Sequence, residues 1–396
     1  MTRRISSLLA ATALLSSLAL TAQEGRSRIE GKVLIPDTSI EQPEDIGVRA
    51  HTNHKILIEP AGGLGPAGGM SPNQLRAFYG VPSAPSGGTI VIVDAYHYPT
   101  ALADFNTFSI QFGLPVENST NATASGNTVF QVVYAGGKQP RGNAGWNQEA
   151  ALDIEWAHAM APNAKIVLVE ANSASFADLY AAVDVAAKIA GVKQISMSWG
   201  ASETSGQSTY DSHFNKATGP IFFASSGDTG GKVIYPSSSA YVVSVGGTSV
   251  TTNATGGFTG ESAWTSGGGG NSAYTPRPSW QSGVTMTGTR RGTPDISSDA
   301  DPATGVAVYD STPYQGYKGW MVFGGTSVSS PCMAGMLNAS GASYANTTAF
   351  LNSLYTKFLS TPKVFRDITS GSNGFPALAG WDYTTGVGAP MGATAF

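Results

Sequence analysis

A serine in a stretch of small residues is the first candidate for chemistry in this sequence. Ser327 follows the pair Gly324-Gly325, and Pro331 stands four residues further on. Because proline is favoured in the first turn of a helix, the pattern predicts a helix that begins near Pro331, with Ser327 just before it. Backbone N–H groups and the positive end of the helix dipole could then stabilise an oxyanion at the serine. The alternative is an ordinary serine cap.

A serine nucleophile needs a base, and two carboxylates one helical turn apart could supply it. Glu149 and Asp153 lie in segment 148–160, which has a helical pattern. On a helix they share one face with Trp156 and Met160. If that face is buried, repulsion and desolvation favour sharing a proton, which gives a base and a group that orients it. If the face is exposed, the like charges cost only a few tenths of a kcal/mol and do no chemistry.

A third acid and one histidine complete the candidates. Asp228 follows Ser226-Gly227 at the end of a predicted strand, where a protonated carboxyl group could donate a hydrogen bond to an oxyanion. Of the five histidines, His97 follows the first predicted strand and remains an alternative base. His51 and His54 lie in a segment predicted to be an extension.

The surrounding sequence predicts the elements that would position these residues. Continuous apolar strands alternate with helices, which is typical of a mainly parallel sheet with helices on both faces, an α/β fold. Sites in such sheets gather at the carboxyl ends of the strands, where Asp94, Trp199 and Asp228 fall. The predicted strands are 89–93, 129–134, 165–169, 194–198, 221–224 and 241–245, and the predicted helices are 101–112, 148–160 and 176–190.

Composition and the N-terminus indicate a secreted protein. The chain has 396 residues, of which 41% are hydrophobic and 12% charged, and a net charge of −4, which argues against disorder, nucleic-acid binding and attraction to anionic membranes. Cys332 is the single cysteine, so the chain forms no internal disulfide. Residues 1–22 combine Arg3-Arg4 with an apolar run and small residues, which predicts a signal peptide and no membrane attachment after its removal.

The chain divides into three predicted segments. After the signal peptide, residues 23–69 are interpreted as an N-terminal extension or short prosegment, because their apolar patches are too short for a core of their own. Order is expected to begin near Ser71, a capping residue followed by Pro72. Residues 70–396 are then expected to form one catalytic domain.

Taken in order, the motifs resemble those of the sedolisins, the serine-carboxyl peptidases, which have a subtilisin-like fold. The resemblance runs from about Ser71 to Pro390. Its motifs are Glu149-x-x-x-Asp153, Ser196-Met197-Ser198-Trp199-Gly200, Ser226-Gly227-Asp228, Arg291-Gly292-Thr293-Pro294-Asp295 and Gly325-Thr326-Ser327-x-x-x-Pro331.

The resemblance implies a role for each candidate. Ser327 would be the nucleophile that forms an acyl-enzyme, and Glu149 its general base and later the acid for the leaving amine. Asp153 would orient Glu149 and share its proton, while Asp228 would stabilise the oxyanion. Asp94, near Trp199, would support the acids.

The resemblance also implies one structural calcium ion near the C-terminus. By position its ligands would be the side chains of Asp367 and Asp382 and the carbonyl groups of Ile368, Leu378 and Gly380. Such hard oxygen ligands suit Ca²⁺. The chain departs from the family at Leu378, where glycine is usual, and in its short N-terminal segment, whose role as a propeptide stays open.

We therefore expect a secreted, monomeric serine endopeptidase that acts on polypeptides in acid. Its activity should fall toward neutral pH, because Glu149 must be ionised while Asp228 is protonated. One alternative is a subtilisin-type hydrolase with His97 as base. The other is a non-catalytic secreted protein that retains the fold, although all four catalytic positions are filled.

Overall fold

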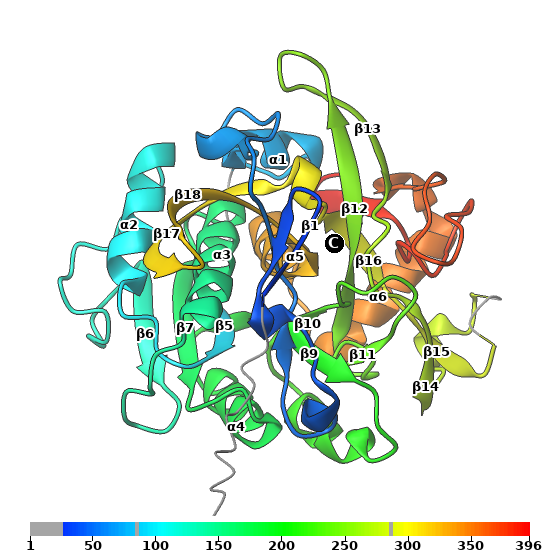
Figure 1. The fold of residues 1–396 in the computed structure, drawn as a ribbon. Coiled ribbons are helices and arrows are strands. Elements are labelled where there is room, and N and C mark those ends of the chain that lie inside the picture. Colours follow the sequence, from blue (N-terminus) through cyan, green and yellow to red (C-terminus); the bar gives the residue numbers. More distant parts are fainter. Residues whose placement is uncertain (1–26, 84–86, 285–287) are drawn as a thin grey trace, which may run out of the picture.

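A computed structural model describes residues 27–83, 87–284 and 288–396. The predicted signal peptide lies outside these residues. A central sheet has the strand order β13-β12-β10-β8-β5-β7-β6, with β16 also paired to β12 (Figure 1). Every pairing in it is parallel except that of β12 with β13. The predicted α/β class with a mainly parallel sheet is therefore confirmed.

The sheet has a strand at each of the six predicted positions, although β12 continues to Thr252, well past the predicted end at 245. Two further strands, β13 and β16, are not predicted. The strands are β5 (Thr89–Ala95), β6 (Phe130–Tyr134), β7 (Lys165–Ala171), β8 (Val192–Met197), β10 (Ile221–Ser225), β12 (Val243–Thr252), β13 (Phe258–Ala263) and β16 (Ile296–Asp299).

Helices cover both faces of the sheet. Successive side chains of a strand point to opposite faces, so each strand contributes to two hydrophobic cores. In β5, Ile90 and Ile92 belong to one hydrophobic core, and Val91 and Val93 to the other. The first core includes residues of α2, α3 and α5, and the second includes residues of α4. The helices are α1 (Pro72–Phe78), α2 (Ala101–Phe112), α3 (Ala144–Met160), α4 (Phe176–Ala186), α5 (Thr326–Ser340) and α6 (Thr347–Ser360).

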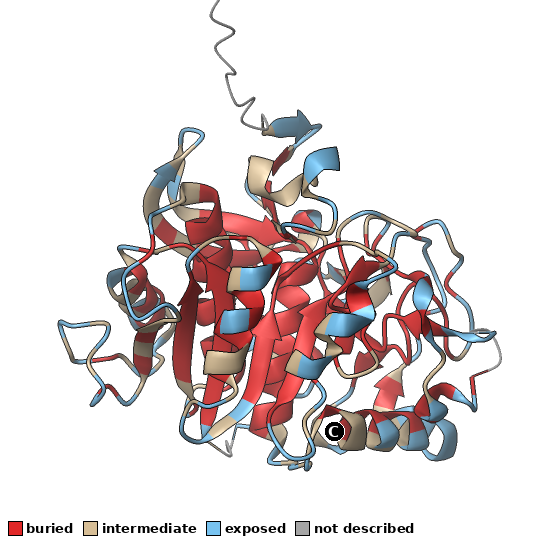
Figure 2. Cartoon of the chain, turned by 90° about the horizontal axis from the view of Figure 1, so that it is seen from below, coloured by how far each residue is buried: buried red, intermediate tan, exposed pale blue. Residues whose placement is uncertain are grey.

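Helices α3 and α5 are packed directly against each other. Gly335 of α5 permits this contact, because a Cβ atom there would lie 2.5 Å from the Cβ of Met160. Both helices are buried along almost their whole length, and Figure 2 shows in red how the buried residues fill the interior of the molecule. Their packing fixes the relative position of the two elements that carry the candidate acids and the candidate serine.

The start of α5 differs from the prediction. The helix begins at Thr326 rather than near Pro331, so Ser327 lies inside its first turn and Pro331 inside the helix. Gly325 makes this early start possible, because its φ of 104° turns the chain sharply out of the preceding strand. Pro331 has no N–H to offer the carbonyl of Ser327, and the hydroxyl of Ser198 donates to that carbonyl instead, at 3.4 Å.

The expectation that order begins near Ser71 is wrong. Strands β1 (Arg28–Glu30), β2 (Val33–Ile35) and β4 (Lys55–Leu57) join β18 (Tyr317–Gly324) and β17 (Val306–Tyr314) in an antiparallel sheet of order β1-β2-β4-β18-β17. In addition, β3 (His51–Thr52) pairs with β9 (Trp199–Ser202). Strands β1 to β4 are two or three residues long. β1 and β2 form a local hairpin, whereas β3 and β4 also pair with β9 and β18 far along the chain, so the local sequence does not indicate them.

The predicted helix start at Ser71 is confirmed, because Ser71 and Gln74 form a capping box at the start of α1. No helix within residues 27–83, 87–284 and 288–396 is long and apolar enough to cross a membrane. The remaining strands are β11 (Ile234–Tyr235), β14 (Gly270–Pro276), β15 (Arg290–Thr293), β19 (Phe365–Arg366) and β20 (Ala389–Pro390).

Candidate active site

Ser327 is fully buried in the first turn of α5. Its hydroxyl donates to the carbonyl of Ser198 at 3.2 Å, and its backbone N–H donates to the carbonyl of Asn53 at 3.1 Å. The N–H is one of those at a helix start that have no partner within the helix. It is therefore free to bind an acceptor from another segment, and here that acceptor is a peptide carbonyl.

Glu149 and Asp153 lie on the buried face of α3, and neither side chain is exposed. The alternative in which the pair faces solvent is therefore excluded. Glu149 Oε2 lies 2.8 Å from Nδ1 of His54, and Asp153 Oδ1 accepts from the hydroxyl of Ser198 at 2.8 Å. Glu149 Oε1 and Asp153 Oδ2 are buried and have no described partner. Ser198 contacts both Asp153 and Ser327, so it links the acid pair to the serine.

Asp94 adds a third carboxyl group to the pair. Asp94 is fully buried near the end of β5, and neither of its carboxylate oxygens has a described hydrogen-bond partner. Burial raises the pKa of Asp94 well above its usual value, and the charges of Glu149 and Glu170 add to this. Burial also raises the pKa of Asp153, with further contributions from Asp94 and Glu149. Asp94 and Asp153 therefore retain protons at pH values where ordinary carboxyl groups are ionised.

Asp228 lies beside the start of α5. Its Oδ1 accepts from the backbone N–H of Thr326 at 2.8 Å and from the Thr326 hydroxyl at 2.9 Å, while Oδ2 is buried without a described partner. Burial raises the pKa of Asp228 to about 6, although Lys55 and the hydrogen bonds from Thr326 oppose that shift. In mildly acidic solution the group is therefore protonated and can donate from Oδ2.

The carbonyl oxygen of Asn53 and Oδ2 of Asp228 face the same small space. A Cβ atom on Gly325 would lie 2.1 Å from the first and 2.6 Å from the second, so only glycine leaves room for both. Together with the N–H of Ser327, a protonated Asp228 would offer two donors to one carbonyl oxygen. This is the arrangement that stabilises an oxyanion.

Sequence reasoning missed the contribution of residues 53–55. Asn53 contacts Ser327, His54 contacts Glu149, and the ammonium group of Lys55 donates to the backbone carbonyl of Asp228 at 3.2 Å. The sequence pattern places His54 in an extension before the catalytic domain, whereas the side chain is fully buried in the structure. Its environment depends on pairing with β9 and β18, which the local sequence does not indicate.

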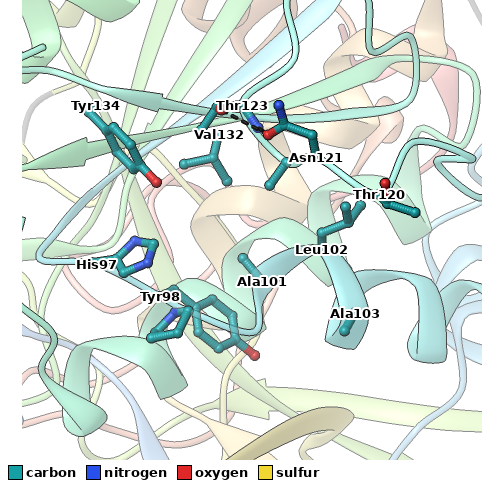
Figure 3. A pocket seen from close by; sticks show the side chains of 12 residues that line it. His97, Tyr98, Ala101, Leu102, Ala103, Thr120, Asn121, Thr123, Val132 and Tyr134 are labelled. Carbon is teal, nitrogen blue, oxygen red and sulfur yellow. Dashed lines mark hydrogen bonds between the residues drawn. The ribbon is translucent and has the colours of Figure 1, made fainter. Parts of the chain in front are cut away.

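His97, the alternative base, contacts Glu170 rather than one of the candidate catalytic acids. Its Nδ1 is 2.8 Å from Oε2 of Glu170, and the ring lines a pocket of about 590 Å³ between α2 and β6. Figure 3 shows His97 and Tyr134 at one end of this pocket and Leu102 at the other. Neither Ser327 nor Glu149 is among the described residues that line it. The structure thus places His97 with an acid, but not with the candidate nucleophile.

The two acids expected to bind calcium meet at one loop. Both carboxylate oxygens of Asp367 accept from the N–H of Gly380, at 3.2 and 3.0 Å, and Asp382 Oδ2 accepts from the N–H of Leu378 at 2.8 Å. Neither carboxylate forms an ion pair with a basic side chain in the described part of the chain. Asp382 Oδ1 also accepts from the N–H and hydroxyl groups of Thr384 and Thr385. The two carboxylates at one loop are hard oxygen ligands of the type that Ca²⁺ prefers, and the ion itself stays a prediction.

Comparison with known proteins gives consistent matches. The model of the subtilase family matches residues 117–349. Sedolisin from Pseudomonas sp. (strain 101) is 28% identical over 92% of this chain, and kumamolisin from Bacillus sp. (strain MN-32) is 32% identical over 64% of it. The solved structure of Pseudomonas sedolisin, a serine-carboxyl proteinase complexed with two molecules of pseudo-iodotyrostatin, has a TM-score of 0.68 and 28% identity and covers 81% of this chain.

The matched proteins differ in how much of their own length is covered. The alignments include 69% of full-length sedolisin but 51% of kumamolisin, so the chain spans about half of the latter. The solved sedolisin chain is covered to 95%.

Proposed function

We propose that this chain, which belongs to the sedolisin family and has its subtilisin-like fold, is a secreted endopeptidase that cuts polypeptides in acidic solution. Family membership makes it a serine-carboxyl peptidase-type hydrolase. One observation carries the proposal: the N–H of Ser327 and Oδ2 of Asp228, which has no hydrogen-bond partner among the described residues, flank a peptide carbonyl beside the buried Glu149.

In the proposed reaction Ser327 attacks the carbonyl carbon of the substrate. Its hydroxyl proton passes to Glu149, whose Oε1 is buried without a described partner. The carbonyl oxygen becomes an oxyanion that accepts from the Ser327 N–H and from protonated Asp228. Glu149 then gives the proton to the leaving amine, and water hydrolyses the resulting acyl-enzyme by the same steps.

Asp153 and Asp94 are proposed to keep Glu149 in a usable protonation state. Their pKa values are raised by burial and by the nearby carboxylates, so they hold protons when Glu149 must be ionised. A protonated neighbour reduces the repulsion that an isolated buried carboxylate pair would suffer. Neither residue need touch the substrate.

A pH profile of peptide cleavage tests this proposal. The wild-type chain should cleave a denatured protein such as casein in acid and lose activity as pH rises through about 6, where Asp228 loses its proton. Glu149→Gln and Ser327→Ala should each lower kcat by at least about a thousandfold. His97→Ala serves as the matched control and should retain most of the activity.

Two outcomes would favour the alternatives. If Glu149→Gln keeps near-full activity while His97→Ala is inactive, the chain is a histidine-dependent hydrolase. If neither acid nor added Ca²⁺ yields turnover, and Ser327→Ala changes nothing, the chain is a non-catalytic protein that retains the fold. A flat profile through pH 7–8 would contradict the role of Asp228.

We further propose one structural calcium ion held by Asp367 and Asp382 with the carbonyl groups of Ile368, Leu378 and Gly380. Support comes from the two carboxylates at one loop and from their lack of a basic partner among the described residues. A bound divalent cation would neutralise these charges and fix the C-terminal loop. Secretion and the monomeric state are likewise proposals, which rest on the signal-like N-terminus and on the family.

A further inference from the structure

Three polar side chains stand in a row at the carboxyl end of the central sheet. Tyr134 of β6, Glu170 of β7 and Asp94 of β5 are paired in register across three neighbouring strands. The residues two positions earlier in each strand all belong to the hydrophobic core that includes α3; they are Val132, Leu168 and Ile92. Because alternate side chains of a strand share a face, the three polar side chains lie on the α3 side as well.

This row leads from a pocket to the candidate catalytic acids. At one end, Tyr134 lines the pocket of about 590 Å³ together with His97, as Figure 3 shows. At the other end, Asp94 lies in the field of Glu149 on α3. Glu170 stands between the two ends, and only 1% of it is exposed. It therefore adjoins the candidate site as a strand neighbour of Asp94.

Glu170 and Asp94 differ in the contacts of their carboxyl groups. Oε1 of Glu170 accepts from the backbone N–H of Tyr98 at 3.0 Å, and Oε2 lies 2.8 Å from Nδ1 of His97. Neither oxygen of Asp94 has a hydrogen-bond partner among the described residues. Because hydrogen bonds from donors stabilise a carboxylate, Glu170 is the easier of the two to ionise. The negative charge of the pair therefore belongs on Glu170 and the proton on Asp94.

The directions of the pKa shifts agree with this order. Burial raises the pKa of Glu170, but the hydrogen bonds from Tyr98 and His97 oppose that shift. Burial raises the pKa of Asp94 well above its usual value, and the charge of Glu170 adds to the rise. No described lysine or arginine forms an ion pair with either acid. The other titratable groups that face the two acids are Glu149, Asp153, His97 and Tyr134.

We propose that Glu170 is a positioning residue for the acid pair of α3: its negative charge keeps the proton on Asp94, so that Glu149 carries the charge of the buried acids and serves as base. This inference rests on the proposed function. As pH rises, Glu170 loses its proton before Asp94 does. An ionised Asp94 would instead repel Glu149 and favour protonation of the base. Glu170 acts through Asp94 and need not touch the substrate.

The test removes the charge of Glu170 and follows the proton on Asp94. Glu170→Gln keeps a side chain of similar size that can still accept from the N–H of Tyr98. In the full Ser327→Ala chain, infrared difference spectra against Asp94→Asn isolate the carbonyl band of protonated Asp94 at each pH. With Glu170→Gln this band should disappear at a pH roughly one unit lower, because a nearby negative charge no longer opposes ionisation.

Glu155→Gln is the matched control for this measurement. Glu155 is also buried, and it accepts from a backbone N–H, that of Tyr309. It lies in the field of Asp104 and Asp310, which are separate from the acids around Asp94. Its replacement should therefore leave the Asp94 band where it is.

Casein cleavage gives a second, independent measurement. In the Asp228→Asn chain, which cannot show the fall near pH 6, Glu170→Gln should move the fall of kcat at higher pH downward by a similar amount. With Asp94→Asn also present, Glu170→Gln should move nothing, since Asp94 no longer titrates. An unshifted band, or an equal shift without Asp94, would overturn the inference but not the proposed function. If Ser327→Ala and Glu149→Gln keep full activity, the proposed function fails, and the role of Glu170 fails with it.

Discussion

Two opposing effects act on the pKa of Asp228. Its Oδ1 accepts two hydrogen bonds from Thr326, which favours ionisation, yet burial raises its pKa to about 6. Burial is the larger effect, so the proton stays on the group in mild acid. Because Oδ1 is occupied as an acceptor, the proton belongs on Oδ2, which faces the carbonyl of Asn53.

Replacement of Asp228 by asparagine should keep a hydrogen-bond donor at this position and remove the ionisation of the carboxyl group. An amide donates at every pH, so Asp228→Asn should keep measurable activity above pH 6, where the wild-type activity falls. Asp228→Ala removes the donor and should lower kcat by roughly 10²–10³-fold at all pH values. The measurement is kcat against pH for the three proteins. An asparagine variant with the same fall near pH 6 would show that another group titrates there.

At the scale of single residues, the sequence indicates which side chains could do chemistry, but not all the residues that contact them. Glu149 and Asp153 were predicted to share a face of a helix, which they do, because the spacing of four residues fixes that geometry. Whether the face is buried depends on α5 and on residues 53–54, which lie far away in the sequence. His54 has no local signal at all, since its position follows from a pairing with β9.

The two helices α3 and α5 act as one packed unit. Gly335 lets them approach so closely that an added Cβ would meet both the Cβ of Met160 and the carbonyl of Ala157. A backbone atom cannot move aside as a long side chain can, so the helices would have to separate.

Gly335→Ala should therefore destabilise the protein and misplace the serine relative to the acids. We expect a loss of roughly 1–3 kcal/mol in the free energy of unfolding, as for other overpacked cores, together with a lower kcat. Chemical denaturation and casein cleavage give the two values. Gly126→Ala is the control, because nothing lies within 4 Å of its added Cβ and it should change neither. An unaffected Gly335→Ala protein would contradict the close contact.

At the scale of elements, the regular parts were predictable and the short ones were not. Helix α2 has the predicted bounds Ala101–Phe112, and β5 begins at the predicted Thr89, because long periodic or continuous apolar runs define them. Pro331 predicts a helix start in its own turn, whereas α5 begins at Thr326, directly after Gly325. Strands such as β2 and β4, with three residues each, depend on partners elsewhere in the chain.

Over the whole molecule, several buried acids away from the serine should make stability depend on pH. Asp310 of β17 contacts Tyr98 and the N–H of Thr312, and it lies in the field of Asp104 and Glu155. Burial raises its pKa to about 7, with the charge of Asp104 adding to the shift. The folded protein therefore binds this proton more tightly than the unfolded chain does.

This shift has a definite sign. Below about pH 4 Asp310 is protonated in both states and costs nothing; as pH rises toward 7 the unfolded chain releases the proton first, so the folded state loses stability. Asp310→Asn cannot titrate and should lose less stability over that range, a difference on the order of a few kcal/mol. Melting temperatures from pH 4 to 7, in a Ser327→Ala background that keeps the chain intact, measure it. The exposed Glu44→Gln is the control, and equal slopes would contradict the prediction.

The proposed calcium ion should also act on the whole fold. Chelation should lower the melting temperature, by an amount equivalent to about 2.7 kcal/mol if the ion had been present at 100 times its Kd. Added Ca²⁺ should restore it and Mg²⁺ should not, because the smaller ion demands a stricter geometry. Asp367→Asn should melt like the chelated protein and respond little to chelator. A wild-type melting temperature that ignores chelation would exclude the ion.

The pairing of β4 with β18 ties the N-terminal segment to the helix that carries the candidate nucleophile. Val322, Phe323 and Gly324 pair with Leu57, Ile56 and Lys55, and α5 begins two residues further on, at Thr326. Residues that the sequence pattern sets apart as an extension thus support the turn beneath Ser327. A change that loosens these early strands would therefore move the serine hydroxyl as well as the outer surface.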